Sequence, residues 1–474
     1  MDWRHSKVSI LGMGKSGLAA AQVLSQRGAR VFISDSRESS ELEREIEFLR
    51  SLGTAYEVGR HSERIYEAQI LVVSPGVSVH SPQVVEAFQR GLKVWGEVEV
   101  AWLLAQVPFI AVTGTNGKST TVTLIDRMLG ERSILAGNIG TPLVQEVDHA
   151  PRGGFITAEI SSFQLETVEK FHPQIGVLTN ITPDHLDRHP NFAEYFAAKA
   201  RLWAQMGEGD LALFNYDDPQ ARRMLELLRS GRLPAWLPEY YPPLEREPNP
   251  QIMTYSLEGE VPQGAWWEEG WIYYRQGGSR ERVVEWTPTL YPGLPGPHNL
   301  SNALAAIAVA RYLGVEAGAI EAALRAHKPL HYRMEEVAKV QGVSFVDDSK
   351  ATNVSSVVAA LKAYAHGPLI LIAGGKDKGF AFEPLAEAIA ASCEQVILIG
   401  QAAERLEQAI RQVSQLPLYK AATLQEAVEY GWQELRGSGG VLLLSPACSS
   451  FDMFKNAEER GRLFAEYAQE IAAR

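Results

Sequence analysis

The chain has 474 residues, of which 46% are hydrophobic and 22% are charged, the balance of an ordinary globular protein. This length predicts about three domains, each long enough to bury its own core. The net charge of −12 argues against a nucleic-acid partner, because such a partner favours a basic protein surface.

The first predicted elements form a strand–turn–helix–strand unit. The strand Val8–Leu11 runs into the glycine turn Gly12–Gly17, the helix Leu18–Gln26 follows, and the second strand, Val31–Ser34, ends at Asp35. An acid at the end of the second strand is typical of dinucleotide folds, where it binds a ribose. The turn therefore predicts either a nicotinamide site or a site for a nucleotide-diphosphate substrate.

The following stretch completes a first domain. The strand Ile70–Val73 ends in Ser74-Pro75-Gly76, and Val94–Glu97 closes a domain that we predict over residues 1–97. The N-terminal residues 1–10 contain no apolar core ahead of the first strand, so we expect no signal peptide.

A second phosphate-binding turn opens the next domain. The apolar strand Phe109–Val112 breaks into Gly114–Gly117 and resumes as the helix Lys118–Leu129. Glycines let backbone N–H groups approach phosphate oxygens, and the start of the helix adds its positive dipole end. Lys118 can reach the terminal phosphates, and the hydroxyl of Ser119 or Thr120 can bind magnesium. Only two residues separate Gly114 from Gly117, fewer than in the standard phosphate loop, so an ordinary glycine-rich turn is the alternative.

Two polar groups follow predicted strands of the same domain. After a small-residue turn, Ala136–Gly140, the strand Phe155–Ala158 delivers Glu159, where a metal ligand or a water-orienting group would lie. The strand Ile175–Leu178 leads into a polar loop that contains His185, a usual place for a site residue in an α/β sheet. A surface acid and a solvated histidine are the alternatives.

A lysine interrupts the apolar stripe of the next helix. The stripe consists of Phe192, Tyr195, Phe196, Leu202 and Trp203. Lys199 falls in the middle of this stripe at helical spacing. The side chain either reaches water past its packed stem or lies desolvated beside a specific partner.

Residues 231–297 are rich in prolines and aromatic side chains. The run Trp266–Tyr274 predicts a hairpin around Glu268-Glu269-Gly270, which we expect to cover the sheet and to carry no chemistry. A helix over Ala303–Leu313 then follows Pro297–Asn302, so Asn299 and Asn302, one turn apart, either face a base or ribose or cap the helix.

The last domain begins near Pro329 and alternates strands with helices, which predicts a parallel sheet. The predicted strands are Phe345-Val346, Leu369–Ala373, Val396–Ile399 and Val441–Leu444. Three of them end in polar loops, at residues 347–353, 374–379 and 445–452. A crevice rich in lysines and hydroxyls suits a small dicarboxylate, whereas solvated loops are the alternative.

These stretches together resemble the Mur ligase family, which joins amino acids to UDP-linked muramic acid precursors of peptidoglycan. The central motifs are Gly114–Thr120 (GTNGKST), Glu159–Glu166 (EISSFQLE), Asn180–Asp187 (NITPDHLD) and Ala197–Lys199 (AAK). Asp348–Asn353 (DSKATN) and Ser445–Asn456 (SPACSSFDMFKN) are similar to the D-glutamate-adding branch of the family. The match spans nearly the whole chain.

The resemblance implies an α/β protein of three domains. Residues 1–97 would form a Rossmann-like domain that binds the UDP substrate, and residues 98–328 a P-loop ATPase-like domain that binds ATP. Residues 329–474 would form a second Rossmann-like domain, with a parallel sheet, that binds the amino acid. ATP would phosphorylate the carboxylate of UDP-N-acetylmuramoyl-L-alanine, and the amine of D-glutamate would attack the acyl phosphate.

The resemblance also implies roles for individual residues. The catalytic set comprises Lys118, Glu159, His185 and Lys199. The Mg²⁺ ligands are Ser119, Glu159, His185 and Lys199, the last as a carbamate. The ATP site comprises Gly114, Thr115, Asn116, Gly117, Lys118, Ser119, Thr120, Asn299, Asn302, Arg333 and Asp348.

The two substrate sites are implied in the same way. The UDP substrate would contact Lys15, Ser16, Asp35, Ser36, Ser74, Gly76, Asn138 and Ser161. D-glutamate would contact Lys350, Thr352, Lys378 and Ser450. Lys376 competes with Lys378 for one role, and Ala457 stands where the family often has an aromatic residue.

Other functions remain open at this point. Another Mur ligase would add a different amino acid, although the acceptor motifs argue against it. Folylpolyglutamate synthases carry the phosphate loop near their N-terminus, without a preceding domain of this length. A nucleotide-gated binding module or a dinucleotide sensor is the alternative from another class.

The expected location follows from the cysteines and the hydropathy. Cys393 and Cys448 are too few for a disulfide framework, which fits a reducing compartment. No apolar run approaches the length of a membrane span. We therefore expect a cytoplasmic monomer that works on small-molecule substrates.

Overall fold

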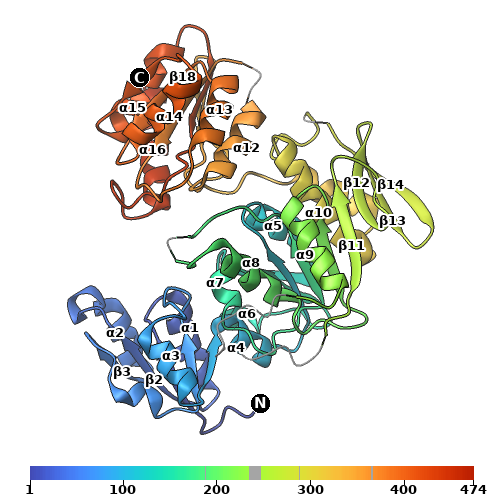
Figure 1. Ribbon diagram of the computed structural model, residues 1–474, viewed down its shortest axis with the longest axis vertical. Coiled ribbons are helices and arrows are strands. Elements are labelled where there is room, and N and C mark those ends of the chain that lie inside the picture. The colour runs from blue at the N-terminus through green and yellow to red at the C-terminus, as the bar shows by residue number, and fades with distance from the viewer. Residues whose placement is uncertain (187, 234–246, 288, 365–366) are drawn as a thin grey trace. The chain divides into compact units, whose positions relative to one another are not determined.

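The computed structural model describes residues 1–474 except 187, 234–246, 288 and 365–366 (Figure 1). The chain divides into two compact units, Met1–Glu285 with Asn302–Ala323, and Trp286–Ser301 with Leu324–Arg474. The α/β fold with parallel sheets is confirmed. The domain boundaries predicted at residues 97 and 328 stay predictions. Within the described residues, no helix is both long and apolar enough to cross a membrane.

The N-terminal sheet is wholly parallel, with the strand order β3-β2-β1-β4-β5. Its strands are β1 Lys7–Leu11, β2 Arg30–Asp35, β3 Ala55–Val58, β4 Ile70–Val73 and β5 Lys93–Gly96. The helices of this region are α1 Lys15–Gln26, α2 Glu43–Ser51 and α3 Pro82–Gln89. The central strands β1 and β4 are buried apart from Lys7, the first residue of β1, because helices cover a parallel sheet on both faces.

The second sheet has the order β14-β13-β12-β11-β10-β9-β6-β8-β7. Its strands are β6 Phe109–Thr113, β7 Ser133–Gly137, β8 Phe155–Glu159, β9 Ile175–Leu178, β10 Leu211–Asn215, β11 Gln251–Ser256, β12 Gly264–Glu268, β13 Trp271–Gln276 and β14 Ser279–Glu285. The helices of this stretch of chain are α4 Glu97–Leu104, α5 Lys118–Leu129, α6 Leu143–Glu146, α7 Ser162–Leu165, α8 Phe192–Ala200, α9 Pro219–Arg229, α10 Pro297–Tyr312 and α11 Ala317–Arg325.

Two expectations for this sheet are wrong. The hairpin β12–β13 forms as predicted, but with β14 it extends the sheet at its edge instead of covering it. The prediction for the rest of that aromatic-rich segment falls partly on residues 234–246, which lie outside the described residues. Ala136 and Gly137, predicted as a turn, end strand β7, since they pair with Ala158 and Glu159.

The third sheet has the order β15-β16-β20-β17-β18-β19 and is parallel except for β15. Its strands are β15 Glu335–Val340, β16 Val343–Asp347, β17 Leu369–Gly374, β18 Gln395–Ile399, β19 Leu418–Lys420 and β20 Gly440–Leu444. Its helices are α12 Val354–Tyr364, α13 Glu383–Ser392, α14 Ala403–Val413, α15 Leu424–Leu435 and α16 Ala457–Ala472.

Candidate active site

The carboxyl ends of three neighbouring strands lie side by side in the second sheet. Strand β6 lies between β8 and β9, and Val112 pairs with Glu159 while Thr113 pairs with Leu178. The carboxyl ends of parallel strands at such a position form the usual binding crevice of an open α/β sheet. The phosphate loop after β6, Glu159 at the end of β8 and the loop after β9 therefore meet there.

The two glycines of the phosphate loop are required by its backbone. Gly114 and Gly117 have φ angles of 146° and 86°, and Gly117 is the residue that precedes α5. A Cβ on Gly114 would lie 1.9 Å from Thr179 Oγ1, and one on Gly117 would lie 2.2 Å from Asn302 Oδ1. Asn302 therefore packs against the phosphate loop, as expected for a residue of the nucleotide site.

Asn180, which begins the NITPDHLD motif but had no predicted role of its own, holds the loop in shape. Its Oδ1 accepts the Asn116 backbone N–H at 2.9 Å, and its Nδ2 donates to the Asn116 carbonyl at 3.0 Å. The Asn180 carbonyl accepts the Thr115 N–H at 2.8 Å. These bonds fix the backbone ahead of α5, whose first N–H groups favour an anion.

The side chain of Lys118 contacts the backbone of the phosphate loop. Its Nζ donates to the carbonyls of Gly114 and Thr115 at 2.9 and 2.8 Å. The ammonium and the N-terminal end of the α5 dipole therefore both favour negative charge at this position. Ser119 is buried in the first turn of α5, and Thr120 follows it.

The residues around Glu159 fit a magnesium ion. The side chain is 2% exposed; its Oε1 accepts from Asn138 Nδ2 at 2.6 Å, whereas its Oε2 is buried without a hydrogen-bond partner. A buried, unsatisfied carboxylate oxygen is costly unless a cation or donor meets it. Within the described residues no three His, Cys, Asp or Glu side chains gather as a metal site.

Lys199 is buried, so the interpretation that its amine reaches water is wrong. The residue is 1% exposed, and its Nζ donates to the Gly114 carbonyl at 2.8 Å, the acceptor that Lys118 also uses. Burial and then the charge of Lys118 lower the pKa of Lys199 well below its usual value, against the opposing effect of Asp184 and Glu159. Lys199, the lysine of the apolar stripe, therefore lies against the phosphate loop, beside Gly114 and Lys118.

His185 lies in the loop after β9 with a left-handed backbone, φ 55°. Its ring is edge-on to Phe163, with the ring centroids 5.0 Å apart, and its Nε2 lies 3.7 Å from Asp184 Oδ2. Its side chain is 42% exposed, in contrast to the buried Glu159 and Lys199. Asp187, which ends the motif quoted around it, lies outside the described residues.

The glycine turn of the N-terminal sheet is built around Asp35. This buried carboxylate accepts the Met13 N–H at 2.7 Å and the Arg37 guanidinium at 2.8 and 3.0 Å. Burial alone would raise the pKa of Asp35, but these bonds outweigh it and the pKa falls to about 2. Both oxygens are thus used within the protein, and Asp35 shapes the turn.

The remaining residues predicted for the UDP substrate fall into two groups. Ser74 donates from Oγ to the Gly12 carbonyl at 2.9 Å, and Ser161 caps α7 by accepting the Gln164 N–H at 3.3 Å. Lys15, at the start of α1, and Ser36 and Gly76, at the ends of β2 and β4, are exposed, and Ser16 is half-buried.

In the second unit, Asp348 is a buried carboxylate. Ser445 donates to its Oδ2 at 2.7 Å, and burial raises the pKa of Asp348 to about 7, with Arg333 acting in the opposite direction. Asn299, on the first turn of α10, donates to the Pro295 carbonyl at 2.8 Å. The predicted loops after β16, β17 and β20 follow neighbouring strands, and Lys376 pairs with Ser449 across two of them.

The predicted acceptor residues differ in exposure. Lys350 is partly exposed and lies 3.3 Å from the carboxylate of Glu458, while Ser450 is 2% exposed. Thr352 is half-buried. Lys378 Nζ lies 5.6 Å from the centroid of the Phe380 ring. The backbone of Lys376 is fixed by its N–H bond to the Ser449 carbonyl at 2.9 Å, which leaves the competition between Lys376 and Lys378 open.

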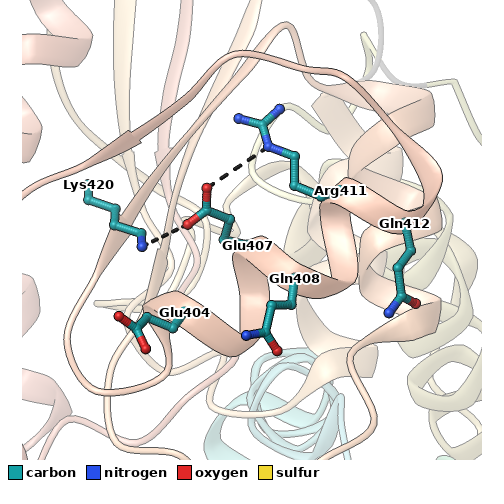
Figure 2. A pocket seen from close by; sticks show the side chains of 6 residues that line it. All are labelled: Glu404, Glu407, Gln408, Arg411, Gln412 and Lys420. Atoms are coloured by element: carbon teal, nitrogen blue, oxygen red, sulfur yellow. Dashed lines mark ion pairs between the residues drawn. The ribbon is translucent and has the colours of Figure 1, made fainter.

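A surface hollow lies along α14 and includes Lys420, the last residue of β19 (Figure 2). Three of its charged side chains form ion pairs: Glu407 bonds Lys420 at 2.7 Å and lies 3.9 Å from Arg411. Because these charges are mutually neutralised in an open hollow, we assign no ligand to it.

Comparisons with known proteins identify the family of the chain. Residues 6–96 match the Mur ligase MurD-like N-terminal domain, 112–236 the Mur ligase middle domain, and 332–448 the Mur ligase glutamate ligase domain. The UDP-N-acetylmuramoylalanine–D-glutamate ligases of Pelotomaculum thermopropionicum and Chlorobaculum parvum are each 39% identical, with 98% of both chains covered. The UDP-N-acetylmuramate–alanine ligase structure of Thermotoga maritima shares the fold, with a TM-score of 0.58 at 18% identity over 98% of this chain and all of that one. The chain belongs to the Mur ligase family.

Proposed function

We propose that the protein is an ATP-dependent ligase that joins D-glutamate to UDP-N-acetylmuramoyl-L-alanine through an acyl phosphate. The observation that carries this proposal is the full-length similarity to ligases named for that reaction, at 39% identity. The phosphate loop, with Glu159 and Lys199 at its edge, supports it physically.

The chemistry needs an activated carboxylate, because a carboxylate and an amine do not condense readily in water. A carboxylate oxygen of the muramoyl-alanine attacks the γ-phosphorus of ATP, and ADP leaves. Lys118 and the N–H groups at the start of α5 hold the phosphates in line for this transfer. The amine of D-glutamate then attacks the acyl carbon, phosphate leaves with the bridging oxygen, and the amine loses a proton.

Ser119, Glu159 and His185 would hold magnesium in this site. When bound, magnesium neutralises the charge that gathers on the transferred phosphoryl group. Glu159 Oε2 is the side-chain oxygen that best supports this role, since it is buried and has no other partner. Asn138 orients that carboxylate through its bond to Oε1.

We assign Lys199 as a carbamate that helps to hold a second magnesium ion. The amine is buried on α8 beside Gly114, near Asp184 and Glu159, where a positive ammonium would repel a metal. Reaction of a neutral amine with carbon dioxide gives an anion, so the charge at this position becomes carboxylate-like. The burial of this side chain supports the assignment, because it favours the neutral amine over the ammonium.

The remaining site residues divide between the other ligands. Asn299, Asn302, Arg333 and Asp348 would serve the nucleotide, and Lys350, Thr352, Lys378 and Ser450 the two carboxylates of D-glutamate. The UDP substrate would bind at Lys15, Ser16, Asp35, Ser36, Ser74, Gly76, Asn138 and Ser161, with Asp35 acting by shaping the turn. We place the enzyme in the cytoplasm, as a monomer, where peptidoglycan precursors are built.

An omission assay tests the proposal. ADP formation is measured with ATP, UDP-N-acetylmuramoyl-L-alanine and D-glutamate, then with each left out in turn, and with L-glutamate, L-alanine and D-alanine in place of D-glutamate. We expect sustained ADP formation only with all three substrates and only with D-glutamate. Turnover with another amino acid would identify a different Mur ligase, and ATP hydrolysis indifferent to the UDP substrate would refute ligation.

A further inference from the structure

Three buried polar side chains, those of Ser162, His189 and Glu166, form a linear cluster next to the turn that begins at His185. His189 Nε2 lies 2.9 Å from Ser162 Oγ, and His189 Nδ1 lies 3.4 Å from Glu166 Oε1. Ser162, His189 and Glu166 are 2%, 1% and 5% exposed. Ser162 begins α7 and Glu166 follows it, whereas His189 lies in the loop before α8. The cluster therefore ties the segment after β8 to the segment after β9.

The order serine, histidine, acid is that of a hydrolase triad, but burial excludes this function. A nucleophilic hydroxyl must reach a substrate, and that of Ser162 is enclosed. A neutral imidazole carries one N–H, which the Glu166 carboxylate favours on Nδ1, and Nε2 then accepts from the Ser162 hydroxyl.

The turn that the cluster supports carries His185 in a strained conformation. The backbone N–H groups of Arg188 and His189 both donate to the His185 carbonyl, at 3.0 and 2.9 Å. The φ of 55° at His185 is a left-handed conformation, which a residue with a Cβ adopts at an energetic cost. Such a conformation persists only where the surrounding structure fixes it.

Phe163 connects the two histidine rings. Its ring is stacked on that of His189, with centroids 5.1 Å apart and an interplanar angle of 15°. The same ring meets His185 edge-on at 5.0 Å. Displacement of the His189 ring would therefore release both the backbone turn and the surface on which the His185 ring rests.

We propose that His189 is a positioning residue, anchored by Ser162 and Glu166 and stacked on Phe163, that fixes the turn and aims His185 at the metal. The inference rests on the proposed function, in which His185 serves magnesium. Partners of a metal ligand that orient it typically affect metal affinity or activity by about 10–100-fold when changed.

The test compares His189→Phe, which keeps an aromatic ring but loses both nitrogens, with His189→Gln, whose amide can still reach Ser162. The matched control is His172→Phe. His172 precedes β9 and pairs at 2.5 Å with Asp210, which precedes β10. Both residues therefore lie at the amino ends of these strands, opposite the carboxyl ends that carry the candidate site. Binding of Mn²⁺ in the presence of ADP is measured by water proton relaxation, beside the Mg²⁺ dependence of turnover.

We expect His189→Phe to weaken Mn²⁺ binding about 10-fold, His189→Gln to recover part of the loss, and His172→Phe to bind as the native protein does. Ser162→Ala should weaken binding in the same direction and decides the question if His189→Phe does not fold. His185→Ala tests the metal role of His185 separately from the positioning role of His189. Unchanged Mn²⁺ binding in His185→Ala would refute the metal role of His185. Weakened binding in His185→Ala together with native binding in both His189→Phe and Ser162→Ala would overturn the positioning role.

Discussion

At the residue scale, the chemistry of the site depends on two lysines that share one hydrogen-bond acceptor and on a carboxylate oxygen that has no hydrogen-bond partner. Lys118 and Lys199 donate to one carbonyl, that of Gly114, so two potential cations meet at a single acceptor. The carboxylate of Glu159 opposes the lowering of the Lys199 pKa, and its Oε2 has no hydrogen-bond partner. A carbamate on Lys199 would relieve the repulsion between the lysines and offer a second anion to a metal.

The carbamate leads to a rescue experiment. Lys199→Ala should lower kcat by about 10–100-fold, because an oriented metal contact is lost. Added acetate or formate should restore part of the rate, since a small carboxylate can enter the space that the side chain leaves. Lys199→Arg fills that space with a permanent cation, so it should be inactive and insensitive to acetate. Full activity of Lys199→Ala would contradict the assignment.

The acceptor lysines lead to a second comparison. Lys350→Ala should raise the KM for D-glutamate by roughly 10–100-fold, the value of a hydrogen bond to a charged group, and change the KM for ATP little. Lys376→Ala and Lys378→Ala form a matched pair for the remaining carboxylate, and we expect the larger effect at Lys378. Equal effects of Lys350→Ala on both KM values would assign this lysine to the nucleotide or to the fold.

At the scale of elements, apolar strands that end in polar loops could be predicted from the sequence. The buried runs of β6, β8 and β9 are continuous, so their ends placed the phosphate loop, Glu159 and the His185 loop correctly. Strands β3 and β15 were missed because they are only partly buried and mix charged with apolar residues. The roles of Asn180 and His189 could not be predicted, since they depend on contacts with Asn116, Ser162 and Glu166 that lie far away in the sequence.

Helix α4 carries a buried carboxylate that should make stability depend on pH. Glu97 accepts the Val144 N–H at 2.6 Å, but its Oε2 has no partner, and burial raises its pKa to about 7. Because the folded state then holds a proton that the unfolded state releases near pH 4.5, stability falls as the pH rises from about 4.5 to 7.

Glu97→Gln should therefore lose this part of the pH dependence. Its free energy of unfolding, relative to the native protein, should rise between pH 5 and pH 8 by up to about 3 kcal/mol. Glu99→Gln is the comparison on the same helix: burial raises the pKa of Glu99 as well, but Glu99 accepts three backbone N–H groups, so its replacement should destabilise the protein at both pH values. Urea unfolding at the two pH values measures both; an identical difference at pH 5 and pH 8 for Glu97→Gln would show that Glu97 does not titrate in this range.

At the scale of the whole molecule, the chain combines two glycine turns that we predict to bind phosphates, in its first unit, with three polar loops in its second. A nicotinamide enzyme would need the acid after β2 to accept ribose hydroxyls. Both oxygens of Asp35 are instead bonded to Met13 and Arg37. This arrangement favours a nucleotide-diphosphate substrate at the first turn and ATP at the second.

Binding to the full-length protein distinguishes these ligands. Calorimetry should detect UDP at the first turn, and UDP should still bind when ADP already occupies the phosphate loop. NADH should show no tight binding by fluorescence. Asp35→Asn should weaken UDP binding, because the Met13 and Arg37 contacts that shape the turn are disturbed. Tight NADH binding that Asp35→Asn abolishes would instead support a dinucleotide sensor.

The acyl phosphate is tested most directly by following oxygen. UDP-N-acetylmuramoyl-L-alanine is labelled with ¹⁸O in both carboxylate oxygens and turned over with ATP and D-glutamate, and the released phosphate is analysed by mass spectrometry. One carboxylate oxygen must leave with the phosphoryl group when the amine displaces it, so we expect one ¹⁸O atom in each phosphate released and one retained in the new amide. Phosphate without ¹⁸O, formed at the rate of turnover, would contradict the acyl-phosphate mechanism.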